Sequence, residues 1–587
     1  MIGDMKKLRL PDFVIGLMLA VGLNGCADRF LDESPDERVE VTTLSQVIQL
    51  AGSAYSTGNY GWLCELSSDN IIDINAPYMA TQDDGREVPV RYNLREYERM
   101  DGEAYRFEPV KSSNGTDSPS EIWEGCYHAI ATANHAFQIL DGLRGNVPVE
   151  DTSEKMRAAY AELYLIRAYH HFILVNVFSQ AYKDDNASRN DIGIPYCMTP
   201  EDVVMVDYDR SNVTDTYDRI ESDLERGLDL ISDVNYEKPK WHFNVKAAHA
   251  FAARFYLFRR EYDKVIEHAD AVLGRDASVL PSVLMDYSVF DDCVTSEDFA
   301  EAWQNPDSEN NLMLIATYSV QFRRHIGYRY ATAGKALKDI EYHYGPNWDW
   351  FLMPAASVGG GTFYDGNADH GFTSARIAER FEYTDKIAGI GYAHIVRREF
   401  TCTELLLERA EARLLGNHDK KGCAEDLIAY ENSRQSFSKS NLDFYTSGGA
   451  LRPLTESMIE RWYSTPGKSN VIADWTTTDS MSLGFNIPKD LYPYMNCLND
   501  MRRYETAYTG LRFFDLKRFG IEYTHIWNAE GTACKLKWND PRRAIEVPQD
   551  VLAAGMASSY LTPSQVSHNV QSRRMTGLCG KIKVENE

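Results

Sequence analysis

Apolar residues recur at steps of three and four along several long segments of this chain, and this helical periodicity constrains the fold more than any other feature. The clearest segment begins at Asn244, a favourable helix N-cap, and ends at Gly274. The small residues Ala248 and Ala252 on its apolar side would let a second helix approach closely. We therefore interpret residues 244–274 as one helix that forms half of a packed hairpin.

Similar patterns cover residues 121–143, 153–182, 213–231, 401–415 and 423–434. Short connections join these segments into pairs. Paired helices of this length, with alanine and aromatic residues at the contacts, are typical of tetratricopeptide-like units, each of which buries its apolar face against its neighbours. We predict a mainly α fold whose helical scaffold spans mainly residues 120–275 and 399–436. An irregular all-helical domain is the alternative.

Two other stretches, residues 276–398 and 437–500, have little helical periodicity. The first is rich in glycine, asparagine, aspartate and aromatic residues. Loops carried on a rigid scaffold often hold the binding function of a protein. We therefore predict that these stretches form a variable region that faces a ligand.

The N-terminus predicts export and a lipid anchor. Lys6 and Lys7 precede an apolar run of about eleven residues, which is too short to cross a bilayer, where roughly 20 are needed. Residues 1–25 are therefore predicted to be a lipoprotein signal peptide that ends in Leu-Asn-Gly before Cys26, the predicted lipidation site. Residues 26–50 would be the lipidated tether and residues 51–587 a single domain. An ordinary cleaved signal peptide with an incidental cysteine is the alternative.

Charge and composition exclude several classes of function. A formal net charge of −26 opposes nucleic-acid binding, which needs clustered Lys and Arg. The other cysteines are scattered and match neither a zinc site nor a disulfide framework.

We find no catalytic signature such as His-Glu-x-x-His or Gly-x-Ser-x-Gly. We therefore predict a protein that is not an enzyme, with no metal site and no cofactor. A surface glycoside hydrolase is the rival, since its two carboxylates would carry no recognisable spacing.

Two motifs of charged and imidazole side chains favour structural roles. Arg512, Asp515 and Arg518 are spaced so that, on a helix, the carboxylate can bridge both guanidinium groups. His170 and His171 are adjacent, and consecutive residues on a helix diverge by about 100°. We interpret the first motif as part of the scaffold and the second as part of a helix interface.

At this point the residues become recognisable. The run Ala161 to Phe172, followed by Gly193-Ile194-Pro195, resembles the SusD/RagB family of outer-membrane nutrient-binding lipoproteins. Further segments similar to that family follow in the same order as in the family: 213–230, 246–257, 405–412, 510–520 and 540–549. Together they cover most of the chain behind the predicted lipidation site.

The resemblance implies both a fold and a partner. It implies one SusD-like domain with about four tetratricopeptide-like helix pairs on one side and a loop-rich variable region on the other. Family members lie at the cell surface, anchored by lipid in the outer membrane, and capture oligosaccharides or polysaccharides for a SusC-type TonB-dependent transporter. Some members take peptides instead, which is the alternative ligand class.

Sugar capture requires aromatic faces for C–H groups and polar side chains for hydroxyls. The segment 342–351 has that composition, and in an extended chain Trp348 and Trp350 would point the same way, with Asn347 and Asp349 as polar partners. Tyr344 completes this predicted site. The alternative is that at least one tryptophan fills the core.

An early Ser68-Asp69-Asn70 element also resembles the family, and its following loop often borders the ligand in that group. We predict that Asp69 and Asn70 hold the shape of this loop and that Tyr78 contacts the ligand. Oxygen-bearing residues alternate at Asp365, Asn367 and Asp369, but the glycine and glutamate of an EF-hand are missing. Only an irregular calcium loop is compatible with that pattern.

Overall fold

The computed structural model describes residues 41–81, 86–90, 92–112, 114–200, 208, 210–340, 345–347, 362–363, 371, 373–434, 453–468, 471–475, 486–561 and 565. The described residues from Leu44 onward form one compact unit. Cys26 and the predicted signal peptide lie outside the described residues. Residues 44–50, which we predicted as tether, belong to the first described helix, in which Val47 and Ala51 are fully buried.

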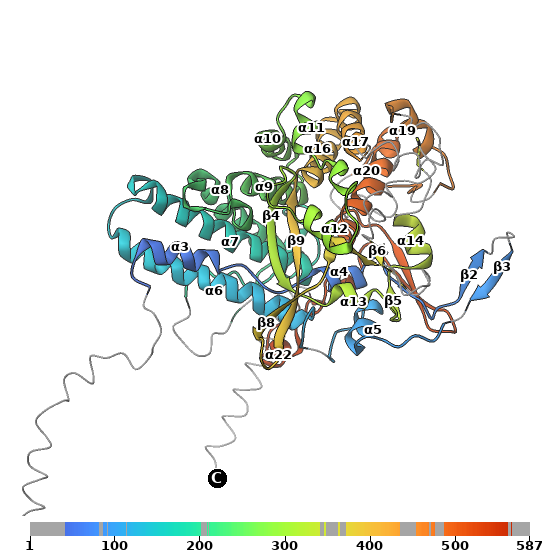
Figure 1. Ribbon diagram of the computed structural model, residues 1–587, viewed down its shortest axis with the longest axis horizontal. Helices are drawn as coiled ribbons and strands as arrows, with labels where there is room; N and C mark the ends of the chain where they lie inside the picture. The colour runs from blue at the N-terminus through green and yellow to red at the C-terminus, as the bar shows by residue number, and fades with distance from the viewer. Residues whose placement is uncertain are drawn as a thin grey trace, which may run out of the picture. The chain divides into compact units, whose positions relative to one another are not determined.

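A stack of helices forms the scaffold, as the periodicity predicts (Figure 1). Helix α6 packs on α7, α7 on α8, α9 on α10, α10 on α16 and α16 on α17. The bounds of these helices are α6 Pro119–Arg144, α7 Glu154–Phe178, α8 Val213–Leu230, α9 Val245–Arg259, α10 Tyr262–Leu273, α16 Cys402–Asn417 and α17 Lys420–Ser433. The predicted fold class, mainly α with packed helical pairs over 120–275 and 399–436, is confirmed.

Local chemistry begins most of these helices. A side-chain oxygen accepts a hydrogen bond from a first-turn backbone N–H, which satisfies one of the donors that a helix start leaves without a partner. The capping residues are Ser118 for α6, Ser153 for α7, Asn212 for α8, Asn244 for α9, Thr401 for α16 and Asp419 for α17.

The prediction of one helix over 244–274 was wrong. The chain leaves the helix at Arg260, which has a φ of 67° and separates α9 from α10. Two backbone carbonyls far away in sequence accept hydrogen bonds from the Arg260 guanidinium, those of Lys183 at 2.8 Å and Arg518 at 3.4 Å. Segment 244–274 is therefore a whole hairpin, because tertiary contacts hold its turn.

Further α-helices lie among the described residues. They are α3 Leu44–Gly52, α4 Gly61–Leu66, α5 Arg99–Tyr105, α11 Leu280–Val283, α12 Ser296–Trp303, α13 Gln321–Arg324, α14 Gly334–Ile340, α19 Glu456–Tyr463, α20 Tyr492–Glu505, α21 Leu511–Arg518 and α22 Gln549–Ala553. Helix α20 begins inside the predicted variable region 437–500, yet it is buried against α16.

A three-stranded antiparallel sheet, in the order β4-β9-β8, joins the scaffold to the rest of the unit. Strands β4 (Asn311–Tyr318) and β9 (Ile390–Thr401) pair from Asn311 opposite Thr401 to Tyr318 opposite His394. Strand β4 is largely buried, because its run Asn-Leu-Met-Leu-Ile-Ala-Thr-Tyr is apolar on both faces. Part of the stretch 276–398, which we predicted as variable and ligand-facing, is therefore core.

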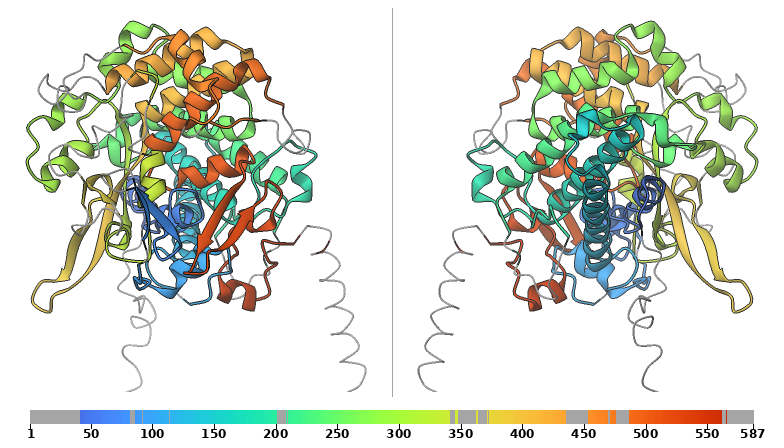
Figure 2. Two further views of the ribbon diagram at one scale, coloured as in Figure 1. Left: turned by 90° about the vertical axis from the view of Figure 1, so that its right-hand side faces the viewer. Right: turned by 90° about the vertical axis from the view of Figure 1, so that its left-hand side faces the viewer.

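Strand β8 (Arg380–Asp385) forms a hairpin with the first half of β9, and this hairpin projects from the body (Figure 2). The other described strands form two-stranded pairs: β1 Ile72–Asp73 with β5 Tyr330–Ala331, β2 Tyr78–Thr81 with β3 Glu87–Val90, β6 Thr362–Phe363 with β7 Thr373–Ser374, and β10 Tyr523–Trp527 with β11 Thr532–Leu536.

The arginine motif of α21 is buried, but its pairing differs from our prediction. Asp515 binds Arg518, with 2.8 Å between Nε and Oδ1, and Arg502 of α20, with 3.0 Å between Nε and Oδ2. Burial alone would raise the pKa of Asp515, but these two guanidinium groups lower it to about 2. Arg512 instead binds Asp69, far away in sequence. The position of α20 decided this pairing, and helical spacing could not reveal it.

The histidine pair is part of a helix interface, as predicted. His170 and His171 are buried, and their Nδ1 atoms lie 2.7 and 2.8 Å from the carbonyl oxygens of Ile166 and Arg167. Their Nε2 atoms accept hydrogen bonds from the backbone N–H groups of Ser56 and Cys197. Burial lowers the pKa of both rings, that of His170 to about 4.

Candidate functional site

A cavity of about 620 Å³ lies where the segment after Ser68-Asp69-Asn70 meets helix α14 and strand β10. Its volume falls within the roughly 300–1,000 Å³ of typical small-molecule sites. Figure 1 shows α14 and the β2–β3 hairpin on the side away from helices α6, α7 and α8. The lining residues are Asp69, Ile71, Ile72, Asp73, Ile74, Ala76, Pro77, Tyr92, Tyr105, Gly334, Ala336, Asp339, Arg503, Tyr523, Thr524, His525 and Ile526.

Asp69 is held in the wall by two arginines. Arg512 binds it through two parallel contacts, Nε to Oδ1 and Nη2 to Oδ2, both at 2.8 Å. Arg503 donates to the Asp69 backbone carbonyl at 2.8 Å and to Asn70 Oδ1 at 2.9 Å. Burial would raise the pKa of Asp69, but the two guanidinium groups hold it well below its usual value. Asp69 and Asn70 therefore hold the shape of this loop, as predicted.

The next part of the wall is fixed by strand pairing and a second bidentate ion pair. Strand β1 pairs with β5, and Asp73 binds Arg329 with contacts of 2.9 and 2.7 Å. The backbone N–H of Asp73 donates to the hydroxyl of Tyr105 at 3.1 Å. These contacts place the apolar residues between Asp69 and Pro77 along one rigid wall.

The floor of the cavity is a stack of rings. The His525 ring lies against Tyr105, with centroids 4.2 Å apart and an interplanar angle of 8°, and against Phe107 on a centroid distance of 4.5 Å. Its Nδ1 and Nε2 lie 2.7 and 2.8 Å from the carbonyl oxygens of Tyr105 and Ser68. The contacts with the two carbonyls favour the protonated ring, whereas burial lowers the His525 pKa. These contacts fix the ring in place, so the floor is a rigid aromatic surface.

Such an arrangement suits a ligand with both apolar and polar faces. Isoleucine, alanine and tyrosine side chains provide apolar surface, and Asp339, Thr524 and Arg503 provide polar atoms. Sugars combine C–H faces with many hydroxyls, and aromatic and carboxylate groups bind these two parts respectively.

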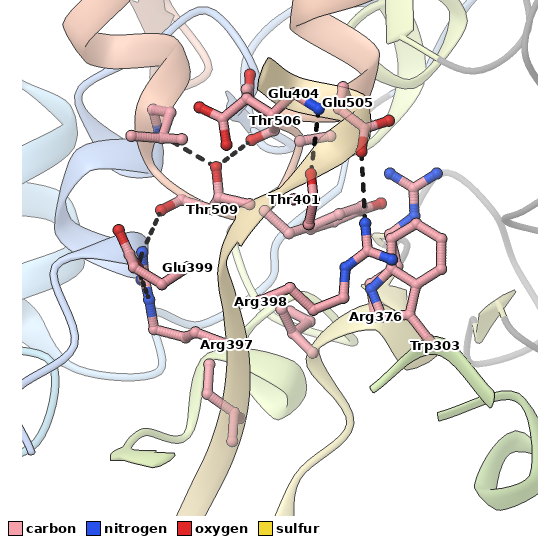
Figure 3. A pocket seen from close by; sticks show the side chains of 15 residues that line it. Trp303, Arg376, Arg397, Arg398, Glu399, Thr401, Glu404, Glu505, Thr506 and Thr509 are labelled. Carbon is pink, nitrogen blue, oxygen red and sulfur yellow. Dashed lines mark hydrogen bonds and ion pairs between the residues drawn. The ribbon is translucent and has the colours of Figure 1, made fainter. Parts of the chain in front are cut away.

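A second cavity, of about 50 Å³, lies in the interior between β9 and α20 (Figure 3). Charged side chains line it. Arg398 lies over the Trp303 ring at 3.5 Å from the centroid and donates to Glu505 at 3.4 Å. Since one water needs roughly 10–15 Å³ of such space, this cavity holds a few waters and cannot admit a sugar ring. We exclude it as a ligand site.

The predicted ligand residues adjoin the 620 Å³ cavity in sequence. Tyr78 directly follows Pro77 of the wall and begins strand β2, and segment 342–351 begins two residues after the end of α14. Tyr344, Trp348, Asp349 and Trp350 lie outside the described residues. Asn347 is buried and donates to Glu431 of α17 at 3.1 Å. The roles of all six residues in binding stay predictions.

Sequence reasoning missed most of the cavity lining. Tyr105, Asp339, Arg503, Tyr523 and His525 come from four distant segments, and no spacing in the sequence marks them as neighbours. Among the described residues, no group of three or more His, Cys, Asp or Glu is placed to hold a metal ion. The possible calcium loop at 365–369 lies outside this part of the chain. No helix in the described ranges is long and apolar enough to span a membrane.

The chain resembles known proteins in sequence and in fold. Residues 29–257 match the family model SusD-like_3, described as starch-binding and associating with the outer membrane. A SusD superfamily protein from Bacteroides vulgatus is 16% identical, with a TM-score of 0.53 over 88% of this chain and 98% of that one. A SusD-like protein from Bacteroides fragilis is also 16% identical, with a TM-score of 0.51 over 90% of this chain and 99% of the other. No curated protein matches this chain.

Proposed function

We propose that this chain, which matches the SusD-like_3 family model over residues 29–257 and has a SusD-like fold, captures oligosaccharides in the 620 Å³ cavity and delivers them to a SusC-type TonB-dependent transporter. The observation that carries this proposal is the cavity itself. It combines an aromatic floor with polar atoms on a rigid wall, and both segments that we predicted as ligand-binding adjoin it in sequence.

The proposal includes the place where the protein works. The lipid at Cys26 anchors the protein in the outer membrane, with the domain at the cell surface. A Cys26→Ser variant is then expected to leave the membrane fraction, and a wild-type chain that stays soluble after export would contradict the anchor. Co-purification of the full chain with a large outer-membrane barrel tests the transporter partner.

Binding without turnover is the second part of the proposal. Asp69 and Asp73 are each held by an arginine through two contacts, so neither is poised to donate a proton to a glycosidic oxygen. Chromatography of a bound oligosaccharide after prolonged incubation tests this part. Release of shorter products would support the glycoside hydrolase instead.

The first test is a binding screen of the full chain in detergent against oligosaccharides and peptides. We expect an oligosaccharide ligand whose affinity falls at least tenfold in Trp348→Ala or Trp350→Ala, or in Tyr92→Ala of the cavity wall. Tyr383→Ala is the control, because Tyr383 lies on β8, away from the cavity, and is 52% exposed. Binding of peptides alone would favour the peptide-binding alternative. Equal effects of all four changes would contradict the site.

A further inference from the structure

Among the described lining residues, Arg503 is the one arginine or lysine that faces the cavity, and its guanidinium is already engaged. Its Nε donates to Asn70 Oδ1 at 2.9 Å, and its Nη2 donates to the Asp69 carbonyl at 2.8 Å. Its Nη1 lies 4.0 Å from Oδ2 of Asp339. Each nitrogen of this side chain therefore faces an oxygen of the protein.

Each carboxylate of the wall faces a guanidinium group. Asp69 is paired with Arg512 and Asp73 with Arg329, and both arginines lie behind the wall. Asp339 faces Arg503, with 4.0 Å between Oδ2 and Nη1, and its side chain is 25% exposed. Three carboxylates thus face three guanidinium groups, so the described part of the wall carries no surplus positive charge.

Resting on the function proposed above, we infer that the cavity selects uncharged oligosaccharides and that Asp339 determines this specificity by engaging Arg503. A uronate or sulfate group that entered the cavity would lose its water without gaining a cation. Burying an anion without a partner is costly, because the charge loses its hydration and gains no opposite charge. The chain's net charge of −26 also repels anions at longer range.

A neutral sugar avoids both the cost of burying an unpaired anion and the repulsion by the negative chain. Its hydroxyls can donate to the Asp339 carboxylate, which accepts through two oxygens, and its C–H faces can lie against the apolar wall. Asp339 therefore both binds hydroxyls and keeps Arg503 from binding an acidic ligand.

The test compares neutral and negatively charged oligosaccharides of equal length. Binding of the full chain in detergent is measured by calorimetry against neutral malto-, xylo- and manno-oligosaccharides and against oligogalacturonate. We expect a neutral ligand to bind and oligogalacturonate to bind at least a hundredfold more weakly. In Asp339→Asn, oligogalacturonate affinity is expected to rise at least tenfold, and the affinity for the neutral ligand to fall.

Asp218→Asn is the matched control. It removes the same charge from helix α8, at a residue that is 47% exposed and does not line the cavity. If both variants raise oligogalacturonate affinity equally, net charge decides the effect and the role of Asp339 is refuted. Tight binding of oligogalacturonate by the wild-type chain would overturn the inference and leave the capture function intact, whatever the variant does. Binding of no saccharide of either class would refute the proposed function, and this inference with it.

Discussion

Replacing Asp69 by asparagine tests whether the wall of the cavity is held by its ion pair. The substitution keeps the shape of the side chain but removes the charge that Arg512 binds through two contacts of 2.8 Å. Breaking a buried pair by removing one partner costs about 3–5 kcal/mol. The Asp69 side chain is 22% exposed, so water screens part of this interaction and we expect a loss of about 2–4 kcal/mol.

A second buried pair provides the control. Arg167 and Asp223 join α7 to α8 through two contacts of 2.7 Å, and both side chains are 6% exposed. Asp223→Asn should cost about 3–5 kcal/mol, at least as much as Asp69→Asn. Because this pair does not line the cavity, ligand affinity should be unchanged in Asp223→Asn and reduced in Asp69→Asn.

Urea denaturation followed by tryptophan fluorescence measures the free energy of unfolding, and calorimetry measures affinity for a ligand found in the screen.

The lowered pKa of Asp69 also determines how the cost of Asp69→Asn changes with pH. A carboxyl group whose pKa is lower in the folded state stabilises the fold above its unfolded pKa, about 4, and loses this contribution as pH falls through the folded value. The difference between wild type and Asp69→Asn should therefore persist from pH 7 to about pH 4 and shrink below it. A loss under about 0.5 kcal/mol, or equal loss of ligand affinity in both variants, would refute this reasoning.

Three further predictions concern the scaffold, each measured by urea denaturation. Gly510→Ala should cost about 2–4 kcal/mol, because Gly510 has a φ of 87° and a Cβ there would lie 3.0 Å from the Gly61 backbone. Gly145→Ala is the control and should cost only about 1–2 kcal/mol, because Gly145 has a φ of 59° but open space around it. Equal costs in the two variants would contradict the steric argument. Burial lowers the His170 pKa from 6.5 to about 4, so the unfolded state takes up a proton first as the pH falls. The free energy of unfolding should therefore fall by up to about 3 kcal/mol between pH 6.5 and 4. His170→Gln should lessen that fall, and an unchanged pH profile in this variant would show that His170 does not cause it. Leu406→Ala in α16, where the side chain is fully buried, should cost about 2–5 kcal/mol. Ile387→Ala, at the exposed tip of the β8–β9 hairpin, should stay within about 0.5 kcal/mol, and a larger cost would reveal a contact there.

The two stretches predicted as variable show where sequence reasoning failed. Strand β4 lies in the first stretch and helix α20 begins in the second, and both belong to the core. The apolar run of β4 lacks helical periodicity, and a short apolar run cannot be distinguished from a loop that packs locally by that criterion alone. Only its pairing with β9 made it a core strand.

What the sequence by itself determined is the set of features that act over three or four residues. Ser153 and Asn244 start their helices by accepting a hydrogen bond from a backbone N–H three residues ahead, and the buried stripes of α8 and α10 follow the helical repeat. These signals are readable because both partners lie in the same short segment.

The tertiary structure alone decided the pairings that join distant segments. Helical spacing suggested Asp515 as the partner of Arg512, but Arg512 binds Asp69, 443 residues away. The turn at Arg260 and the cavity between residues 69–77, α14 and β10 arise in the same way. A buried guanidinium needs a carboxylate or carbonyl partner, but this chain has 87 acidic residues, and only the packing of the core brings one of them within reach.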